Sequence, residues 1–175
     1  MPLIDTPNGK LYFEDAGAGD AVLCLLPQSS GPVGVGPLVD SLARRHRVIC
    51  YEQAGTGRSP PRPADQELSM QLLSGEAQAL LDALDIARVH LLCHSTGCGI
   101  GVAMTAASPA RVASLTLISP WTHGDAYLRA AQNLRIAIAR VLDPVAYARY
   151  NAALLFPPEY RNAHFDGFDR SAEMH

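Results

Sequence analysis

The chain of 175 residues has 48% apolar side chains, 18% charged side chains and a formal net charge of −3. A chain of this length can bury one core without the help of disulfides, and its composition excludes wholesale disorder. The mildly acidic balance, 14 basic against 17 acidic side chains, lacks the positive surface that nucleic acids and anionic lipids require. We therefore expect a globular protein whose partners include neither nucleic acid nor a membrane.

The sequence also bears on location and on bound metals. No segment has the pattern of a secretory signal peptide, and no apolar stretch approaches the roughly 20 residues that span a bilayer. The four cysteines, Cys24, Cys50, Cys93 and Cys98, form no C-x-x-C pair and lack zinc-knuckle spacing. We interpret them as buried, reduced thiols, expect no metal or cofactor, and predict a soluble cytoplasmic protein.

Short apolar runs alternate with helical patterns in the first two thirds of the chain. Strands are predicted at 10–14, 21–26, 47–51, 88–93 and 112–119, and helices at 37–45, 68–84 and 95–107. Continuous apolar runs are typical of parallel strands that are covered on both faces. The alternation therefore predicts an α/β fold with a parallel sheet and right-handed crossovers.

The pattern changes after residue 119. Apolar residues recur at helical spacing over 125–142, and Pro144 is placed to open a second helix that runs to about Leu155. Two consecutive helices without a strand between them break the alternation. In such folds an inserted helical pair usually forms a lid, so we predict a core over 1–120 and a helical lid segment over 121–175.

The most specific motif is Cys93-His94-Ser95-Thr96-Gly97, which closes a predicted strand and opens a predicted helix. The pattern small-x-Ser-x-Gly is typical of a nucleophile elbow, a turn so tight that larger neighbours of the serine would collide. At a helix N-terminus the free N–H groups favour a developing oxyanion. The alternative is that Ser95 merely caps the helix, which would not require small residues two positions away on both sides.

With this motif the chain resembles the α/β-hydrolase fold family. The segment 51–59 resembles the D-x-R-G-x-G-x-S loop of that family, with Glu52 where Asp is common and Ala54 where Arg is common. A dinucleotide-binding interpretation of Gly55-Thr56-Gly57 fails because the third glycine is absent and a proline-rich loop follows. Within the family, residues 55–57, Trp121 and 154–160 are similar to the branch of 3-oxoadipate enol-lactonase and the aminoacrylate hydrolases.

The resemblance implies a serine hydrolase of small carboxylic esters, lactones or related acyl compounds, with Ser95 as the nucleophile. The backbone N–H groups of Gln28 and Thr96 would bind the oxyanion, although Pro27 stands where relatives carry a His-Gly pair. The substrate pocket implied by the resemblance is lined by Trp121, Tyr127 and Leu128.

In this family the serine acts with an acid and a histidine, and the same resemblance places both of them beyond the lid. About the last third of a usual family domain is missing here. Within the chain, His123 is the candidate base and Asp125 the candidate acid. The alternative is a catalytically incomplete, hydrolase-like module that binds a ligand or a partner, or a fragment, and in either case the chain catalyses no reaction. The run from Val112 to Ser119 would become an apolar sheet edge, so we expect association through that edge into a homo-oligomer, poor solubility, or a longer product.

Overall fold

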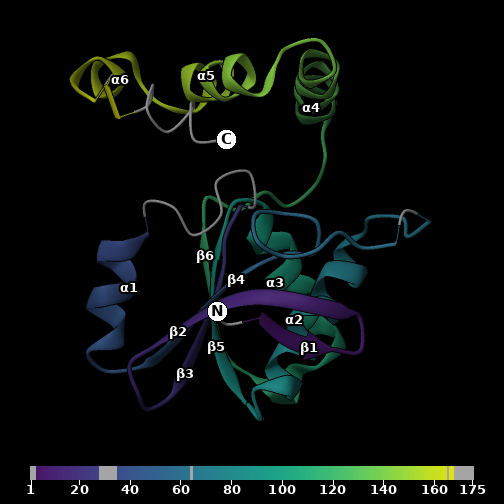
Figure 1. The fold of residues 1–175 in the computed structure, drawn as a ribbon, viewed down its shortest axis with the longest axis vertical. Coiled ribbons are helices and arrows are strands. Elements are labelled where there is room, and N and C mark those ends of the chain that lie inside the picture. Colours follow the sequence, from purple (N-terminus) through teal and green to yellow (C-terminus); the bar gives the residue numbers. More distant parts are fainter. Residues whose placement is uncertain (1–2, 28–34, 64, 165, 168–175) are drawn as a thin grey trace. The chain divides into compact units, whose positions relative to one another are not determined.

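The structure is a computed structural model that describes residues 3–27, 35–63, 65–164 and 166–167. The chain divides into two compact units, Met1–Trp121 and Thr122–His175. Figure 1 shows a sheet flanked by helices in the first unit and helices alone in the second.

The first unit contains one six-stranded sheet, in the order β1-β2-β4-β3-β5-β6. Its strands are β1 (Leu3–Thr6), β2 (Gly9–Ala16), β3 (Ala21–Leu25), β4 (Arg47–Glu52), β5 (Val89–His94) and β6 (Val112–Ile118).

The prediction of a parallel sheet is confirmed for β3, β4, β5 and β6, whose pairings are all parallel. It needs correction for the first two strands, because β1 pairs with β2, and β2 with β4, in antiparallel fashion. A two-residue turn connects β1 to β2, and a connection this short permits only antiparallel pairing. The sheet is therefore mixed, with a parallel majority.

Helices cover both faces of this sheet. Helix α1 (Gly36–Ala43) lies on one face, while α2 (Met70–Ala83) and α3 (Thr96–Ala107) lie on the other (Figure 1). Helix α2 begins where the Ser69 side chain accepts a hydrogen bond from the Leu72 N–H. A single 3-10 turn, Pro109–Arg111, leads from α3 into β6.

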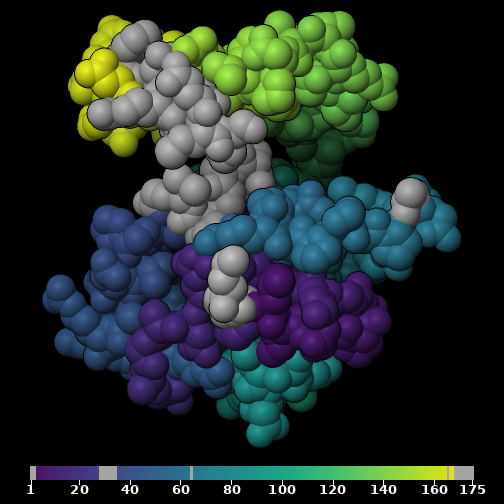
Figure 2. All heavy atoms as spheres, in the orientation of Figure 1, coloured from purple at the N-terminus to yellow at the C-terminus, as the bar shows by residue number. Residues whose placement is uncertain are grey.

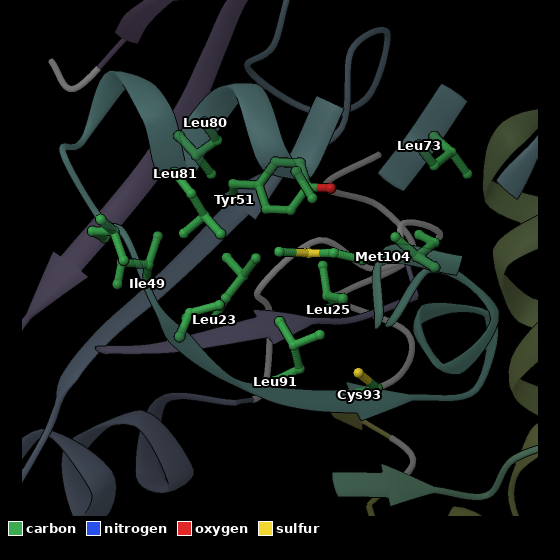
Figure 3. Close-up of a cluster of buried hydrophobic side chains, with 14 of the residues drawn as sticks. Leu23, Leu25, Ile49, Tyr51, Leu73, Leu80, Leu81, Leu91, Cys93 and Met104 are labelled. Atoms are coloured by element: carbon green, nitrogen blue, oxygen red, sulfur yellow. The ribbon is translucent and has the colours of Figure 1, made fainter. Parts of the chain in front are cut away.

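The larger core lies between the sheet and the pair α2 and α3. Figure 3 shows Leu23 and Leu91 of the strands among Leu80 and Leu81 of α2, with Met104 of α3 in the same cluster. All five side chains are almost completely buried. Each such burial contributes about 1.5–3 kcal/mol, so this cluster contributes to holding both α2 and α3 on the sheet.

Helix α3 approaches the strands closely because glycines form its inner face. A Cβ added at Gly97 would overlap the backbone carbonyl of Leu25, at the end of β3. A Cβ at Gly101 would overlap the Cys93 sulfur and would lie 3.1 Å from Leu115 Cδ1. The backbone of α3 therefore packs directly on β3 and β5.

The second unit consists of helices α4 (Ala126–Ala139), α5 (Pro144–Leu155) and α6 (Pro158–Ala163). Helices α4 and α5 follow the predicted pattern and begin at the capping carboxylates of Asp125 and Asp143. None of the three helices has a fully buried side chain. Among the described residues, no helix combines the length and the apolar character needed to cross a membrane.

Strand β6 is the last strand of the sheet, and within the described residues it pairs with β5 alone. It has no charged residue and no proline, the features that usually protect an edge strand. Its last two side chains, Leu117 and Ile118, are 38% and 43% exposed.

The tight packing of α3 predicts a difference between two glycine-to-alanine substitutions. Gly101→Ala should cost about 1–3 kcal/mol in free energy of unfolding, because the new methyl group overlaps Cys93. Gly75→Ala, in α2, adds a methyl group where no atom lies within 4 Å; it should be neutral or stabilise by up to about 1 kcal/mol through helix propensity. Urea unfolding of both variants checks this, and equal effects would contradict the close packing.

We propose that the free edge of β6 pairs with a second copy of the chain. The exposed Thr116 lies on this edge, and Thr116→Lys should lower the mass measured by light scattering at high concentration, because edge lysines oppose strand pairing. Ala106→Lys, at an exposed position of α3, is the control and should leave that mass unchanged. A monomeric wild type over the whole concentration range would refute the proposal.

Candidate active site

Ser95 joins β5 to α3 in a backbone conformation that non-glycine residues rarely adopt, with φ 52° and ψ −118°. Such a conformation costs about 1–3 kcal/mol and persists only where the surroundings enforce it. Ser95 is at the N-cap position, yet its side chain makes no capping hydrogen bond. The interpretation of Ser95 as a simple helix cap is therefore wrong, and its hydroxyl is not used for capping.

The end of β6 holds this turn in place. The carbonyl oxygen of Ile118 accepts the backbone N–H of Ser95 at 3.0 Å and the thiol of Cys98 at 3.3 Å. The N–H of Cys98 in turn donates to the Ser95 carbonyl at 2.9 Å. Because the N–H of Ser95 is already bonded, the first N–H that could bind an oxyanion at this turn is that of Thr96.

Thr96 is the first residue of α3, and its N–H has no partner four residues earlier within the helix. The contact of Gly97 with Leu25 places this helix end against the end of β3. The second predicted donor, Gln28, follows Leu25 by three residues and lies outside the described residues. Thr96 and the end of β3 are thus adjacent, as an oxyanion site built from both would require.

Cys93, two residues before Ser95, is completely buried. Burial raises the pKa of its thiol to about 12, so the sulfur stays protonated and unreactive at neutral pH. Its role is steric, because its sulfur occupies the space left free by Gly101.

The other predicted site residues are divided between the two units. Trp121 ends the first unit, follows β6 and is 41% exposed. His123 and Asp125 belong to the second unit, as do Tyr127 and Leu128.

Within the second unit, Asp125 Oδ1 accepts the N–H of Leu128 at 2.7 Å and so caps α4. His123 Nδ1 lies 3.0 Å from the Thr122 hydroxyl, and Tyr127 is 82% exposed. The proposed acid therefore also has a structural role at the start of its helix.

The loop after β4 is anchored by a carboxylate that the sequence analysis noted only as a departure from the family pattern. Glu52 is buried, and it accepts the backbone N–H of Arg58 as well as Arg58 Nη2 at 2.7 Å. Ser59 Oγ donates to the Glu52 carbonyl at 2.6 Å and accepts the Tyr12 N–H at 2.9 Å. This loop runs along the surface beside the β1–β2 hairpin (Figure 2).

A second buried carboxylate, Glu76 of α2, was not predicted. It accepts the Ala54 N–H at 3.2 Å and pairs with Arg62 Nη2 at 3.2 Å. Burial raises the pKa of Glu76, although both partners oppose the shift. The signal in the sequence was a glutamate among the apolar positions of the predicted helix. Among the described residues, no three His, Cys, Asp or Glu side chains are grouped as metal ligands.

The Glu52–Arg58 pair predicts a pH-dependent stability. Burial acts to raise the pKa of Glu52, but the hydrogen bonds and charge of Arg58 outweigh it, so this pKa lies below its usual value. A lowered native pKa stabilises the fold above the unfolded pKa, and the gain is lost as the pH falls through the native pKa. Glu52→Gln should therefore cost about 1–3 kcal/mol at pH 7.

The cost of Glu52→Gln should shrink below about pH 4.5, and urea unfolding at pH 7 and pH 3.5 measures both values. The control is Asp5→Asn, which removes an exposed ion pair with Lys10 and should change stability by less than about 1 kcal/mol. If Glu52→Gln lowers the free energy of unfolding equally at both pH values, the result would contradict the stabilising Glu52–Arg58 ion pair.

Comparison with known proteins supports one family. Residues 26–160 match the model of the alpha/beta hydrolase fold family. The chain is 32% identical over 160 residues to the protein named "Putative carbamate hydrolase RutD" of Azorhizobium caulinodans, covering 91% of this chain and 60% of the relative. It is 33% identical over 159 residues to the protein of the same name in Variovorax paradoxus, covering 88% and 59%.

Solved structures show the same fold. A hydrolase from Pseudomonas aeruginosa superposes with a TM-score of 0.83 at 23% identity, covering 99% of this chain and 65% of that one. The enol-lactonase from Burkholderia xenovorans superposes with a TM-score of 0.77 at 20% identity, covering 98% and 66%. The chain spans about 60% of the length of the relatives it matches in sequence. With its mixed sheet, its strained serine turn and these matches, the chain belongs to the α/β-hydrolase fold family.

Proposed function

We propose that the protein is a serine hydrolase that cleaves small carboxylic esters, lactones or related acyl compounds through an acyl-enzyme on Ser95. The observation that carries the proposal is the strained backbone of Ser95, whose hydroxyl does not cap the helix it precedes. A turn that stores strain and leaves the serine hydroxyl unused for capping is characteristic of a nucleophile rather than of a structural serine.

In the proposed reaction, the Ser95 oxygen attacks the acyl carbon while its proton passes to a base. The backbone N–H groups of Thr96 and Gln28 hold the oxyanion, and the leaving group departs with a proton. Water then cleaves the acyl-enzyme. His123 is the candidate base within this chain and Asp125 the candidate acid, and Trp121, Tyr127 and Leu128 are the candidate residues for substrate contact.

The names of the relatives support this substrate class. The sequence relatives are named for carbamate hydrolysis, and the structural neighbours include an enol-lactonase and an enzyme that degrades N-acyl homoserine lactones. Carbamates, esters and lactones share an acyl carbon that is open to attack by an activated serine.

One specific observation favours a second candidate, a module that binds an acyl compound without turnover. The carboxylate of Asp125 is already engaged as the cap of α4. In that case the fold would bind the ligand, but the candidate base His123 would lack an acid partner and would not activate Ser95.

Hydrolysis of p-nitrophenyl acetate and p-nitrophenyl butyrate distinguishes the two candidates. Ser95→Ala should lower kcat/KM by at least about 1,000-fold, because the nucleophile is lost. Ser119→Ala is the matched control, since Ser119 also has a positive φ, of 52°, and it should leave the rate within about twofold of wild type. Hydrolysis that survives Ser95→Ala would refute the nucleophile, and a wild type without hydrolysis would favour the binding module.

A further inference from the structure

Two side chains from distant parts of the sequence converge on Gly99 of α3. A Cβ added at Gly99 would lie 3.0 Å from Met70 Sδ and 3.3 Å from Trp121 Cη2. Both distances are shorter than ordinary van der Waals contact. The absent side chain of Gly99 therefore leaves the space in which the thioether and the indole approach the helix.

This contact lies beside the serine turn. Gly99 follows Ser95 by four residues and is the fourth residue of α3, so it lies at the end of the first turn of the helix that Ser95 precedes. The carbonyl of Ile118 accepts the Ser95 N–H, and Trp121 follows Ile118 by three residues. Trp121 is therefore brought to the first turns of α3 by the same connection that holds the turn.

The surface formed by Met70, Gly99 and Trp121 is accessible. Trp121 is 41% exposed, while Met70 and Gly99 are half-buried. Indole and thioether groups are polarizable and apolar, and they pack well against apolar or planar ligand groups.

Two arginines of the loop after β4 form ion pairs. Arg58 is paired with Glu52, and Arg62 is paired with Glu76. Both guanidinium groups therefore already have carboxylate partners.

We propose that Met70 and Trp121 form an apolar wall that selects a compact, uncharged acyl group next to Ser95, and that Gly99 makes room for this wall. The inference rests on the proposed function, because it assigns the substrate preference of the same site. It adds two specificity-determining positions, Met70 and Gly99, to the predicted Trp121.

Fluorescence offers a test that does not depend on catalysis, because Trp121 is the only tryptophan of the sequence. The probe is 4-bromobenzamide, whose bromine quenches indole emission on contact. The full chain should show saturable quenching. The charged analogue 4-bromobenzoate should bind at least about tenfold more weakly, because the apolar wall would have to desolvate its carboxylate.

Gly99→Leu should weaken binding of 4-bromobenzamide by at least about tenfold, since the new side chain occupies the space of the wall. Gly99→Ala, which is the milder change, should give an intermediate loss and serves if the leucine variant does not fold. The matched control is Gly75→Leu in α2, where no atom lies within 4 Å of an added Cβ, and its binding should equal that of wild type.

Ser95→Ala separates this inference from the proposed function. It should keep the saturable quenching, because the wall does not use the hydroxyl, while it loses ester hydrolysis. Three results would refute the apolar wall even if esters are hydrolysed. They are non-saturable quenching, unchanged binding of 4-bromobenzamide by the Gly99 variants, and equal binding of 4-bromobenzoate and 4-bromobenzamide. Binding that follows the expected pattern in a protein without hydrolysis would support the wall and refute the proposed function.

Discussion

The close approach of α3 to the ends of β3 and β5 determines the conformation of the turn at Ser95. Gly97 lies against the carbonyl of Leu25 and Gly101 against the sulfur of Cys93, so the helix cannot move away from the sheet without opening the core. The chain must therefore pass from β5 into α3 within a single residue. Ser95 adopts a left-handed conformation as a consequence, and the strain is held by the surrounding packing.

Other features of the site follow from this turn. The carbonyl of Ile118 accepts the Ser95 N–H, so Thr96 supplies the first N–H of this turn that could bind an oxyanion. Burial keeps the Cys93 thiol protonated, which removes a competing nucleophile. Two arginines of the loop after β4 are paired with buried carboxylates, Arg58 with Glu52 and Arg62 with Glu76.

Much of the fold could be predicted from the sequence, because its signals are local. Apolar runs located β3 to β6, and periodicity placed α2 and α4 within a few residues of their observed ends. Strand β1 was not predicted, since its four residues, LIDT, are half polar and only partly buried. Helix α6 was not predicted either, because its first residue follows another proline and its six residues are too few for periodicity to show.

Only the part of the candidate site that a local sequence motif determines could be predicted. The small residues around Ser95 predicted the turn, and the positive φ confirms the strain expected there. The convergence of Met70 and Trp121 on Gly99 could not be predicted, because it depends on how three distant segments pack. The capping role of Asp125 was also missed, since an aspartate before a helix fits both an acid and a cap.

We propose that the strained turn makes Ser95 the reactive serine of the protein. Treatment of the full chain with a fluorophosphonate, followed by intact mass measurement and peptide mapping, tests this proposal. A single adduct is expected, on the peptide that contains Ser95. An adduct on another serine, or an unmodified protein after exhaustive treatment, would contradict it.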